Sequence, residues 1–481
     1  MLSQRLSRVV IVTIIIGLLA ILPIFDLTSI EGNTQRVKAA ASDQFDSLLP
    51  LIFAKYAPAK SVSGVEMYEI NDAAGQKKMV EVGNTWVRRN ALYWVNAEAV
   101  EGEYKWWFQP RLSQEIINAS NHGFEMILVV RKAPDWALEK PGLDCGRIRA
   151  DKIEAFANFM YKAVKWYGQP PYNVKYWQIW NEPEVEPGGQ QAGNINGCWG
   201  DPNEPYFGGA YYSDVLKQVY PKIKEADPEA KVVIGGLLMD CNNSPDCPNY
   251  LEGILNHNGA NDGANYFDVL GFNAYDYYFD AIGKYGNPNW YSKWDTSSTY
   301  SGPVVGAKLA YIRNLFTKYN VQGKTLINTE GALLCGDTGL EPTCLTGDYE
   351  NTKAYYLAQL FATTLAEGLE ANIWYSLTGW RGSGLFDPLM NPLPAYEAVK
   401  IANAELKYAT FVRSITEYAG LRGYEFDRQG QTIWILWAQT TSGSTITLPG
   451  TPTKIIDALG ILESVTGTTH NVTVKPLWIE W

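Results

Sequence analysis

Hydrophobic runs alternate with amphipathic stretches along most of the chain. The runs are short and rich in β-branched and aromatic residues, which is typical of buried strands. Predicted strands occupy residues 62–68, 84–88, 124–131, 174–181, 231–236, 268–275, 325–329 and 371–376. The stretches between them place apolar residues at helical spacing. Predicted helices occupy residues 112–121, 151–166, 211–225, 250–255, 305–319, 352–367 and 395–406.

This alternation predicts an α/β fold. Eight repeats between residues 62 and 407 match a (β/α)8 TIM barrel with enlarged loops. The alternative is an open doubly wound sheet, which commonly carries a glycine-rich phosphate-binding turn after its first strand. No such turn follows residues 62–68, so the barrel is favoured.

The last part of the chain, residues 408–481, lacks helical periodicity. It contains alternating runs such as 432–437, separated by turn residues such as Pro449-Gly450. This pattern predicts a small all-β, sandwich-like domain after the barrel. Its tryptophans either pack in the core or bind sugar, and they are Trp434, Trp437, Trp478 and Trp481.

The first 41 residues have the pattern of a targeting segment. Arg5 and Arg8 precede an apolar run at 9–25, as in an export signal or an amino-terminal membrane anchor. Ala39-Ala40-Ala41 offers small residues for cleavage, although it lies far from the apolar run. Both interpretations predict an extracellular or cell-surface protein, secreted or anchored through 9–25, with 42–61 as a linker.

Composition limits the partners of this 481-residue chain. Its net charge of −11 argues against nucleic acid and anionic membrane surfaces. Aromatic residues make up 13% of the sequence, with 17 Trp and 30 Tyr. Part of this aromatic surface is core, but sugar-binding clefts also use aromatic faces. The sequence does not predict the oligomeric state.

The six cysteines are consistent with export. Spacing suggests that Cys241 pairs with Cys247 and Cys335 with Cys344, which leaves Cys145 for Cys198. The alternative is a set of free thiols. A metal site is not expected, because the sequence has no CxxC motif, no HExxH motif and only three histidines. No cofactor is predicted either.

The clearest chemical signal is the segment 176–183, a stiff aromatic strand that stops in Asn181-Glu182-Pro183. Proline prevents the strand from continuing within a sheet. Glu182 is therefore expected at the carboxyl end of a barrel strand, where such barrels place their chemistry. Glu330 ends a second strand in the same way and is followed by Gly331.

Two carboxyl groups at one barrel mouth suit glycosidic bond cleavage. One protonates the leaving oxygen and the other faces the anomeric carbon. Retaining enzymes hold the two about 5–5.5 Å apart. The sequence also lacks the Gly-x-Ser-x-Gly motif of esterases.

Around these residues the sequence resembles the clan A glycoside hydrolases, and family 39 and its relatives in particular. Trp-Asn-Glu-Pro at 180–183 carries most of the resemblance. It implies that Glu182 is the acid/base, Glu330 the nucleophile, and Asn181 a ligand of the sugar 2-hydroxyl. Glu182 would then need a raised pKa to donate its proton.

Other positions follow from the same resemblance. Arg88 is expected near the nucleophile, with Arg89 as its alternative. Tyr275 is expected to donate to the nucleophile, and Asn273 to face the sugar, although the clan often has histidine there. Trp374 and Trp380 are rival candidates for the aromatic surface beneath the sugar.

These observations predict a retaining β-glycoside hydrolase that acts on a carbohydrate substrate through a covalent glycosyl-enzyme. The alternatives are a non-catalytic carbohydrate-binding surface protein on the same barrel and a transglycosylase. The long loops at 184–207 and 276–299 are expected to set specificity. The sugar, the linkage and endo or exo action are not predicted.

Overall fold

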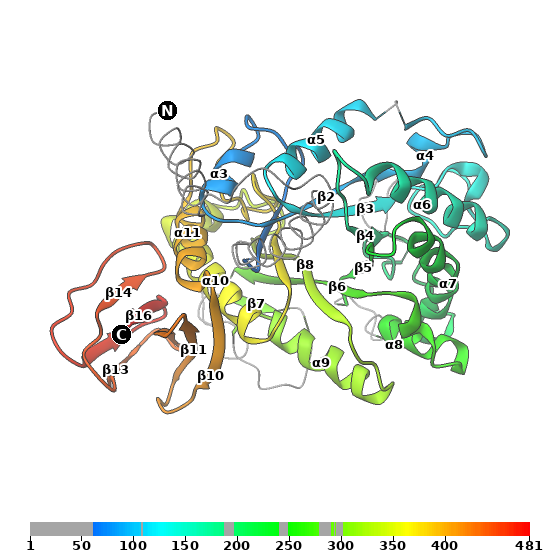
Figure 1. The fold of residues 1–481 in the computed structure, drawn as a ribbon. Helices are drawn as coiled ribbons and strands as arrows, with labels where there is room; N and C mark the ends of the chain where they lie inside the picture. Colours follow the sequence, from blue (N-terminus) through cyan, green and yellow to red (C-terminus); the bar gives the residue numbers. More distant parts are fainter. Residues whose placement is uncertain are drawn as a thin grey trace, which may run out of the picture. The chain divides into compact units, whose positions relative to one another are not determined.

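Eight parallel strands close into a barrel (Figure 1). The computed structural model describes residues 61–106, 109–186, 197–239, 249–278, 290–292, 294 and 302–481. The barrel strands are β1 (Ser63–Glu66), β2 (Trp86–Tyr93), β3 (Glu125–Arg131), β4 (Tyr176–Ile179), β5 (Lys231–Leu237), β6 (Val269–Tyr278), β8 (Thr325–Cys335) and β9 (Ala371–Trp374). Their order is β5-β4-β3-β2-β1-β9-β8-β6, and pairing of β5 with β6 closes the ring. A short strand, β7 (Trp290–Ser292), pairs antiparallel with the end of β6.

Helices cover the outside of the barrel (Figure 1). They are α3 (Gln76–Glu81), α4 (Trp94–Ala97), α5 (Pro110–Asn121), α6 (Ile153–Tyr167), α7 (Gly209–Ala226), α8 (Asn249–Asn256), α9 (Val305–Lys318), α10 (Gly347–Ala366) and α11 (Pro394–Leu406). The predicted TIM barrel is confirmed, and each predicted strand overlaps an observed one. The sequence does not predict α3, because its six residues are too few to show a helical period.

Large side chains fill the amino-terminal half of the barrel. This interior cluster consists of Trp86, Ile127, Tyr176, Val233, Val269, Ile327, Ala371 and Ile373. On β1 a glycine, Gly64, takes the corresponding place, and a Cβ there would lie 2.6 Å from the Cβ of Trp86. Because apolar groups fill this half, the polar side chains of the strands gather at the carboxyl-terminal half.

The chain after α11 forms an all-β domain, as predicted. Its strands are β10 (Ala409–Ile415), β11 (Leu421–Arg428), β12 (Gln431–Ala438), β13 (Ser444–Thr447), β14 (Lys454–Asp457), β15 (Thr469–Val472) and β16 (Leu477–Glu480). Five of them form an antiparallel sheet in the order β10-β11-β12-β16-β14, and β13 pairs with β15.

Strand β12 is apolar on both faces because both faces of its sheet are covered. Trp437 belongs to the core shared with the barrel, whereas Trp434 belongs to the core of the β domain. Trp478 of β16 lies in the shared core, and Trp481 packs against the domain core. These placements agree with packing roles for the four tryptophans.

Two predicted disulfides are present, Cys145–Cys198 and Cys335–Cys344. Cys241 and Cys247 lie outside the described residues, as do the predicted targeting segment and parts of both long loops. In the part of the chain that is described, no helix is long and apolar enough to cross a membrane.

Candidate active site

Strand β4 ends in a sharply turned segment that carries Glu182. Trp180 and Glu182 have left-handed backbone conformations, with φ of 68° and 45°. Residues other than glycine keep such conformations only where surrounding contacts hold them. Here the Trp180 N–H donates to the Val130 carbonyl at 2.8 Å, and the Glu182 N–H donates to the Gly235 carbonyl at 2.7 Å. Glu182 is thus fixed, nearly buried, between β3 and β5.

Asn273 of β6 holds the carboxyl group of Glu182. Its Nδ2 donates to Glu182 Oε1 at 2.8 Å, while its Oδ1 accepts from Thr329 Oγ1 at 2.8 Å. The threonine therefore fixes which end of the amide faces the carboxyl group. The main-chain carbonyl of Asn273 accepts from the buried ammonium of Lys308 at 2.8 Å.

Strand β8 has a bulge at the position of Glu330. The register pairs Phe272 with Asn328 and then Asn273 with Glu330, so Thr329 is the extra residue. A bulge redirects the side chains beside it. It places Glu330 level with Asn273, whose amide contacts Glu182. The two predicted carboxyl groups therefore lie at the same mouth of the barrel, with Asn273 beside both.

Two donors hold Glu330. Arg88 Nη1 donates to Glu330 Oε1 at 2.6 Å, and the Tyr275 hydroxyl donates to Oε2 at 2.5 Å. Burial, together with the charge of Glu330, raises the pKa of Tyr275 well above its ordinary value. The phenol consequently stays protonated and remains a donor. A cation and a neutral donor therefore hold one oxygen each of the Glu330 carboxyl group.

Arg88 connects four strands. Besides Glu330, its guanidinium donates to Glu66 at 2.9 Å, to Asn181 Oδ1 at 2.6 Å and to Gln178 Oε1 at 2.9 Å. Burial lowers the pKa of Arg88, but the carboxylates of Glu66 and Glu330 outweigh this effect and raise it. The fixed fork of five N–H donors explains why arginine suits this place.

Arg89, the predicted alternative to Arg88, points to the outside of the barrel. Its Nε donates to Glu115 of α5 at 2.6 Å. Neighbouring residues of a strand face opposite sides of the sheet, so only one of the two arginines can enter the barrel. The structure brings Arg88 to the site.

Glu66 is a site residue that the sequence did not reveal. It ends β1, is buried, and shares the guanidinium of Arg88 with Glu330. Burial raises the pKa of Glu66 to about 7, against the attraction of Arg88 and with the repulsion of Glu330. An acidic residue at the end of a short buried strand was the available signal, but no motif surrounds it.

Aromatic side chains lie beside the nucleophile candidate. The ring of Tyr275 makes edge contacts with Tyr375 at 6.2 Å and Trp380 at 6.4 Å between centroids. Tyr68 donates a hydrogen bond to the Tyr375 hydroxyl at 3.2 Å. Trp380 is 48% exposed, so one aromatic surface next to the buried site remains open to a ligand.

Trp374, expected beneath the sugar, lies elsewhere. It is fully buried, its indole donates to the Ser383 carbonyl at 2.8 Å, and its ring packs against Tyr356 of α10. The reason is strand alternation: Ile373 belongs to the barrel interior, so Trp374 faces the helices. The aromatic residue beside the site is Tyr375, which the sequence left unassigned.

Among the described residues, no group of three or more His, Cys, Asp or Glu could hold a metal ion. The site is instead built from buried carboxyl groups, one guanidinium, amides and phenols. All predicted site residues except Trp374 come together at the carboxyl end of the barrel.

No protein-family model matches the sequence, and no curated protein is significantly similar to it. Solved structures do resemble the fold. A family 39 glycoside hydrolase from Bacteroides cellulosilyticus WH2 has a TM-score of 0.64 and 18% identity, over 87% of this chain and 80% of that chain. The structural neighbours of this chain include clan A glycoside hydrolases.

Two further neighbours belong to other families. A family 30 endoxylanase from Clostridium papyrosolvens C71 has a TM-score of 0.56 and 13% identity, over 88% of this chain and 97% of that one. A family 51 α-L-arabinofuranosidase from Thermotoga petrophila RKU-1 has a TM-score of 0.51 and 13% identity, over 88% and 97%. At these identities the likeness concerns the fold.

Proposed function

We propose that this protein is a retaining glycoside hydrolase that cleaves β-linked oligo- or polysaccharides. The observation that supports it best is the unequal treatment of two buried carboxyl groups at one barrel mouth. Glu330 accepts from the guanidinium of Arg88 and the phenol of Tyr275, whereas Glu182 accepts from the neutral amide of Asn273. A carboxylate held by a cation suits the nucleophile, and a second carboxyl group at the same mouth suits the acid/base.

In the first step, a Glu330 oxygen forms a bond to the anomeric carbon as the bond to the leaving oxygen breaks. Glu182 gives its proton to that oxygen, so the leaving sugar departs as an alcohol. The negative charge of Glu330 is consumed in the new ester bond. Arg88 and Tyr275 hold the carboxylate in place for the attack.

In the second step, the ionised Glu182 takes a proton from water, and the water oxygen bonds to the anomeric carbon. The ester bond to Glu330 breaks, and the carboxylate is restored. Arg88 holds the Oδ1 of Asn181, the residue that we expect to contact the sugar 2-hydroxyl. Trp380 supplies an open aromatic face beside Tyr275.

Two alternatives differ in their predicted chemistry. A binding protein would need no pair of carboxyl groups at the barrel mouth, and the contacts that Arg88 and Tyr275 make with Glu330 argue against it. A transglycosylase would use the same first step and pass the sugar to another sugar in the second. The two disulfides are compatible with the proposed extracellular or cell-surface location.

The test is activity on aryl β-glycosides and β-linked polysaccharides, measured beside Glu330→Ala. The panel includes xylan and an aryl α-L-arabinofuranoside, because two structural neighbours carry the corresponding names. Activity that Glu330→Ala abolishes, with retained anomeric configuration by proton NMR, supports the proposal. Inversion, or undiminished activity in the variant, contradicts it. An added acceptor sugar distinguishes hydrolysis from transfer.

A further inference from the structure

The main-chain carbonyl of Cys145 is an anchor for the segment that carries Glu182. It accepts hydrogen bonds from the indole N–H of Trp180 at 3.1 Å and the indole N–H of Trp199 at 3.0 Å. The Cys198 N–H donates to the same carbonyl at 3.2 Å. Trp180 lies two residues before Glu182, so this carbonyl contacts the turn on which the proposed acid/base stands.

The residues after Cys198 continue this contact along the main chain. The Gly197 N–H donates to the Asn181 carbonyl at 2.5 Å, and the Trp199 N–H to the Pro183 carbonyl at 2.9 Å. The fit leaves no room for a side chain, because a Cβ on Gly197 would lie 2.5 Å from the Pro183 Cα. Residues 197–199 therefore brace the backbone on both sides of Glu182.

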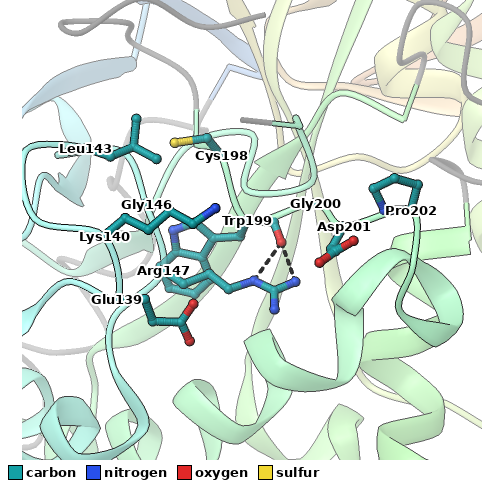
Figure 2. A pocket seen from close by; sticks show the side chains of 10 residues that line it. All are labelled: Glu139, Lys140, Leu143, Gly146, Arg147, Cys198, Trp199, Gly200, Asp201 and Pro202. Atoms are coloured by element: carbon teal, nitrogen blue, oxygen red, sulfur yellow. Dashed lines mark hydrogen bonds between the residues drawn. The ribbon is translucent and has the colours of Figure 1, made fainter. Parts of the chain in front are cut away.

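The disulfide joins the two parts of this brace. Cys145 lies in the loop after β3, Cys198 in the loop after β4, and their bond fixes one loop to the other. Figure 2 shows Cys198 and Trp199 beside Arg147, at a pocket of about 330 Å³ between the two loops. Two guanidinium nitrogens of Arg147 donate to the Trp199 carbonyl, at 2.8 and 2.5 Å.

We propose that Cys145–Cys198 is a positioning element for the acid/base, which holds Glu182 where it can protonate the leaving oxygen. The inference rests on the proposed function. It follows from the left-handed turn at Trp180 and Glu182, which surrounding contacts must hold. Without the disulfide, the Cys145 carbonyl can move away from the indoles of Trp180 and Trp199. The turn that carries Glu182 then loses the hydrogen bonds that hold it from the loop after β3.

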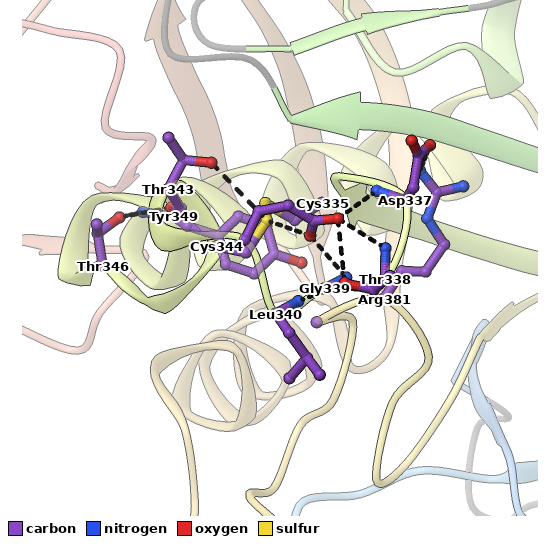
Figure 3. The surroundings of a disulfide bond; sticks show 12 residues. Cys335, Asp337, Thr338, Gly339, Leu340, Thr343, Cys344, Thr346, Tyr349 and Arg381 are labelled. Carbon is purple, nitrogen blue, oxygen red and sulfur yellow. Dashed lines mark hydrogen bonds and ion pairs between the residues drawn. A yellow bond between two sulfur atoms is a disulfide. The ribbon is translucent and has the colours of Figure 1, made fainter.

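The second disulfide provides a matched control because it supports the opposite side of the site. Cys335 ends β8, and its N–H donates to the Arg381 carbonyl at 2.9 Å, next to Trp380 (Figure 3). A Cβ on Gly339, within the loop that this disulfide closes, would lie 2.6 Å from the Arg381 Cα. Cys335–Cys344 therefore braces the loop that carries Trp380, whereas Cys145–Cys198 braces the turn that carries Glu182.

The test uses leaving groups of different acidity. A phenyl glycoside needs a proton from the acid, whereas a 2,4-dinitrophenyl glycoside departs without one. Both are made with the sugar on which the wild type acts. In Cys145→Ser/Cys198→Ser, kcat/KM for the phenyl glycoside is expected to fall at least about tenfold further than for the dinitrophenyl glycoside. In Cys335→Ser/Cys344→Ser the ratio between the two substrates should stay at the wild-type value.

A folded Cys145→Ser/Cys198→Ser variant with the wild-type ratio would overturn the inference. If this variant does not fold, Trp199→Phe tests the inference instead. It keeps an aromatic ring at this position and removes the indole N–H that donates to the Cys145 carbonyl. A ratio shifted in the same direction by about threefold or more supports the inference, and an unchanged ratio overturns it.

Glu182→Gln separates this inference from the proposed function. In this variant kcat/KM for the phenyl glycoside must fall far more than kcat/KM for the dinitrophenyl glycoside. If it does not, the acid/base assignment is wrong whatever the disulfide variants do. If it does and the cysteine variant keeps the wild-type ratio, the hydrolase proposal stands and the positioning role fails.

Discussion

The two carboxyl groups at the barrel mouth are held in opposite ways. Glu330 stands within the eleven-residue strand β8, between neighbours that pair with it on both sides. Glu182 stands beyond the four-residue strand β4, on a turn that loops must support. The difference suits the two proposed roles: a nucleophile needs a fixed charge, whereas an acid must exchange a proton and meet leaving groups of different shapes.

The partners differ in the same way. Glu330 is bound through charge by Arg88, and Glu182 through a neutral amide by Asn273. Damage on the Glu330 side should therefore affect every substrate alike, while damage on the Glu182 side should depend on the leaving group. Substitutions on the two sides of the site test that contrast.

Arg88→Lys should have the largest effect. Lysine keeps the charge but cannot serve four acceptors in a fixed geometry. We expect kcat/KM to fall by about 10² to 10³-fold, equally for phenyl and dinitrophenyl glycosides, as for loss of a major electrostatic contact. Because Glu66 is left underpaired in a buried place, the free energy of unfolding should fall by about 3 kcal/mol in urea titrations. Wild-type kinetics in the folded variant would contradict this account.

Tyr275→Phe and Asn273→Ala form a pair that compares the two sides directly. Each removes one hydrogen bond to a carboxyl group. Tyr275→Phe should lower kcat about tenfold or more for both substrates, because Glu330 loses a donor. Asn273→Ala should affect the phenyl glycoside most. If the ratio of activity on the phenyl and dinitrophenyl glycosides were the same in both variants, the proposed difference between the two sides would be wrong.

Glu66→Gln should change the pH dependence of stability. Burial raises the pKa of Glu66 from its ordinary 4.5 to about 7, so between these values the folded protein holds a proton that the unfolded chain has released. Stability from this group is therefore present at low pH and is lost as pH rises through about 7. Glu66→Gln should flatten that decline in melting temperatures measured from pH 4.5 to 8.

Glu184 is the control for that experiment. It too is buried, and burial raises its pKa to about 7, but it accepts a hydrogen bond from the main-chain N–H of Met239 rather than from Arg88. Glu184→Gln should flatten the same decline without changing kcat. If neither variant alters the pH dependence, the raised pKa values are wrong.

Trp380→Ala should have the smallest effect. The side chain is 48% exposed and touches the site through ring edges only. KM should rise a few-fold, with kcat and melting temperature near the wild-type values, because an exposed residue contributes about 0.5 kcal/mol or less to stability. A large loss of kcat would show that Trp380 orients the reacting bond.

The sequence predicts the barrel well because each strand carries its own hydrophobic run. It also indicates Glu182 and Glu330, which follow such runs in the sequence. Glu182 does lie beyond its strand, but Glu330 does not end a strand as expected, because β8 continues to Cys335. What it leaves open depends on which face of a strand a residue occupies. Trp374 was expected by residue type, but alternation from Ile373 places Tyr375 inward instead.

Contacts between distant segments are the other gap. Glu66 belongs to the site because β1 lies beside Arg88, and the sequence does not show that they are neighbours. The Cys145 carbonyl accepts from Trp180 and Trp199 because two loops that are distant in sequence lie together. The left-handed turn at Trp180 has no local cause, because tryptophan does not favour it. Tertiary contacts impose this conformation, and local sequence patterns do not predict such contacts.

The most direct test of the central claim is the mass of the Glu182→Gln variant during turnover of a dinitrophenyl glycoside. Without the acid/base, the first step still proceeds and the second is slowed, so a glycosyl-enzyme should accumulate. We expect the mass to rise by one sugar, carried on the peptide that contains Glu330. A sugar on another peptide, or no adduct while dinitrophenol is released in a burst, would contradict it.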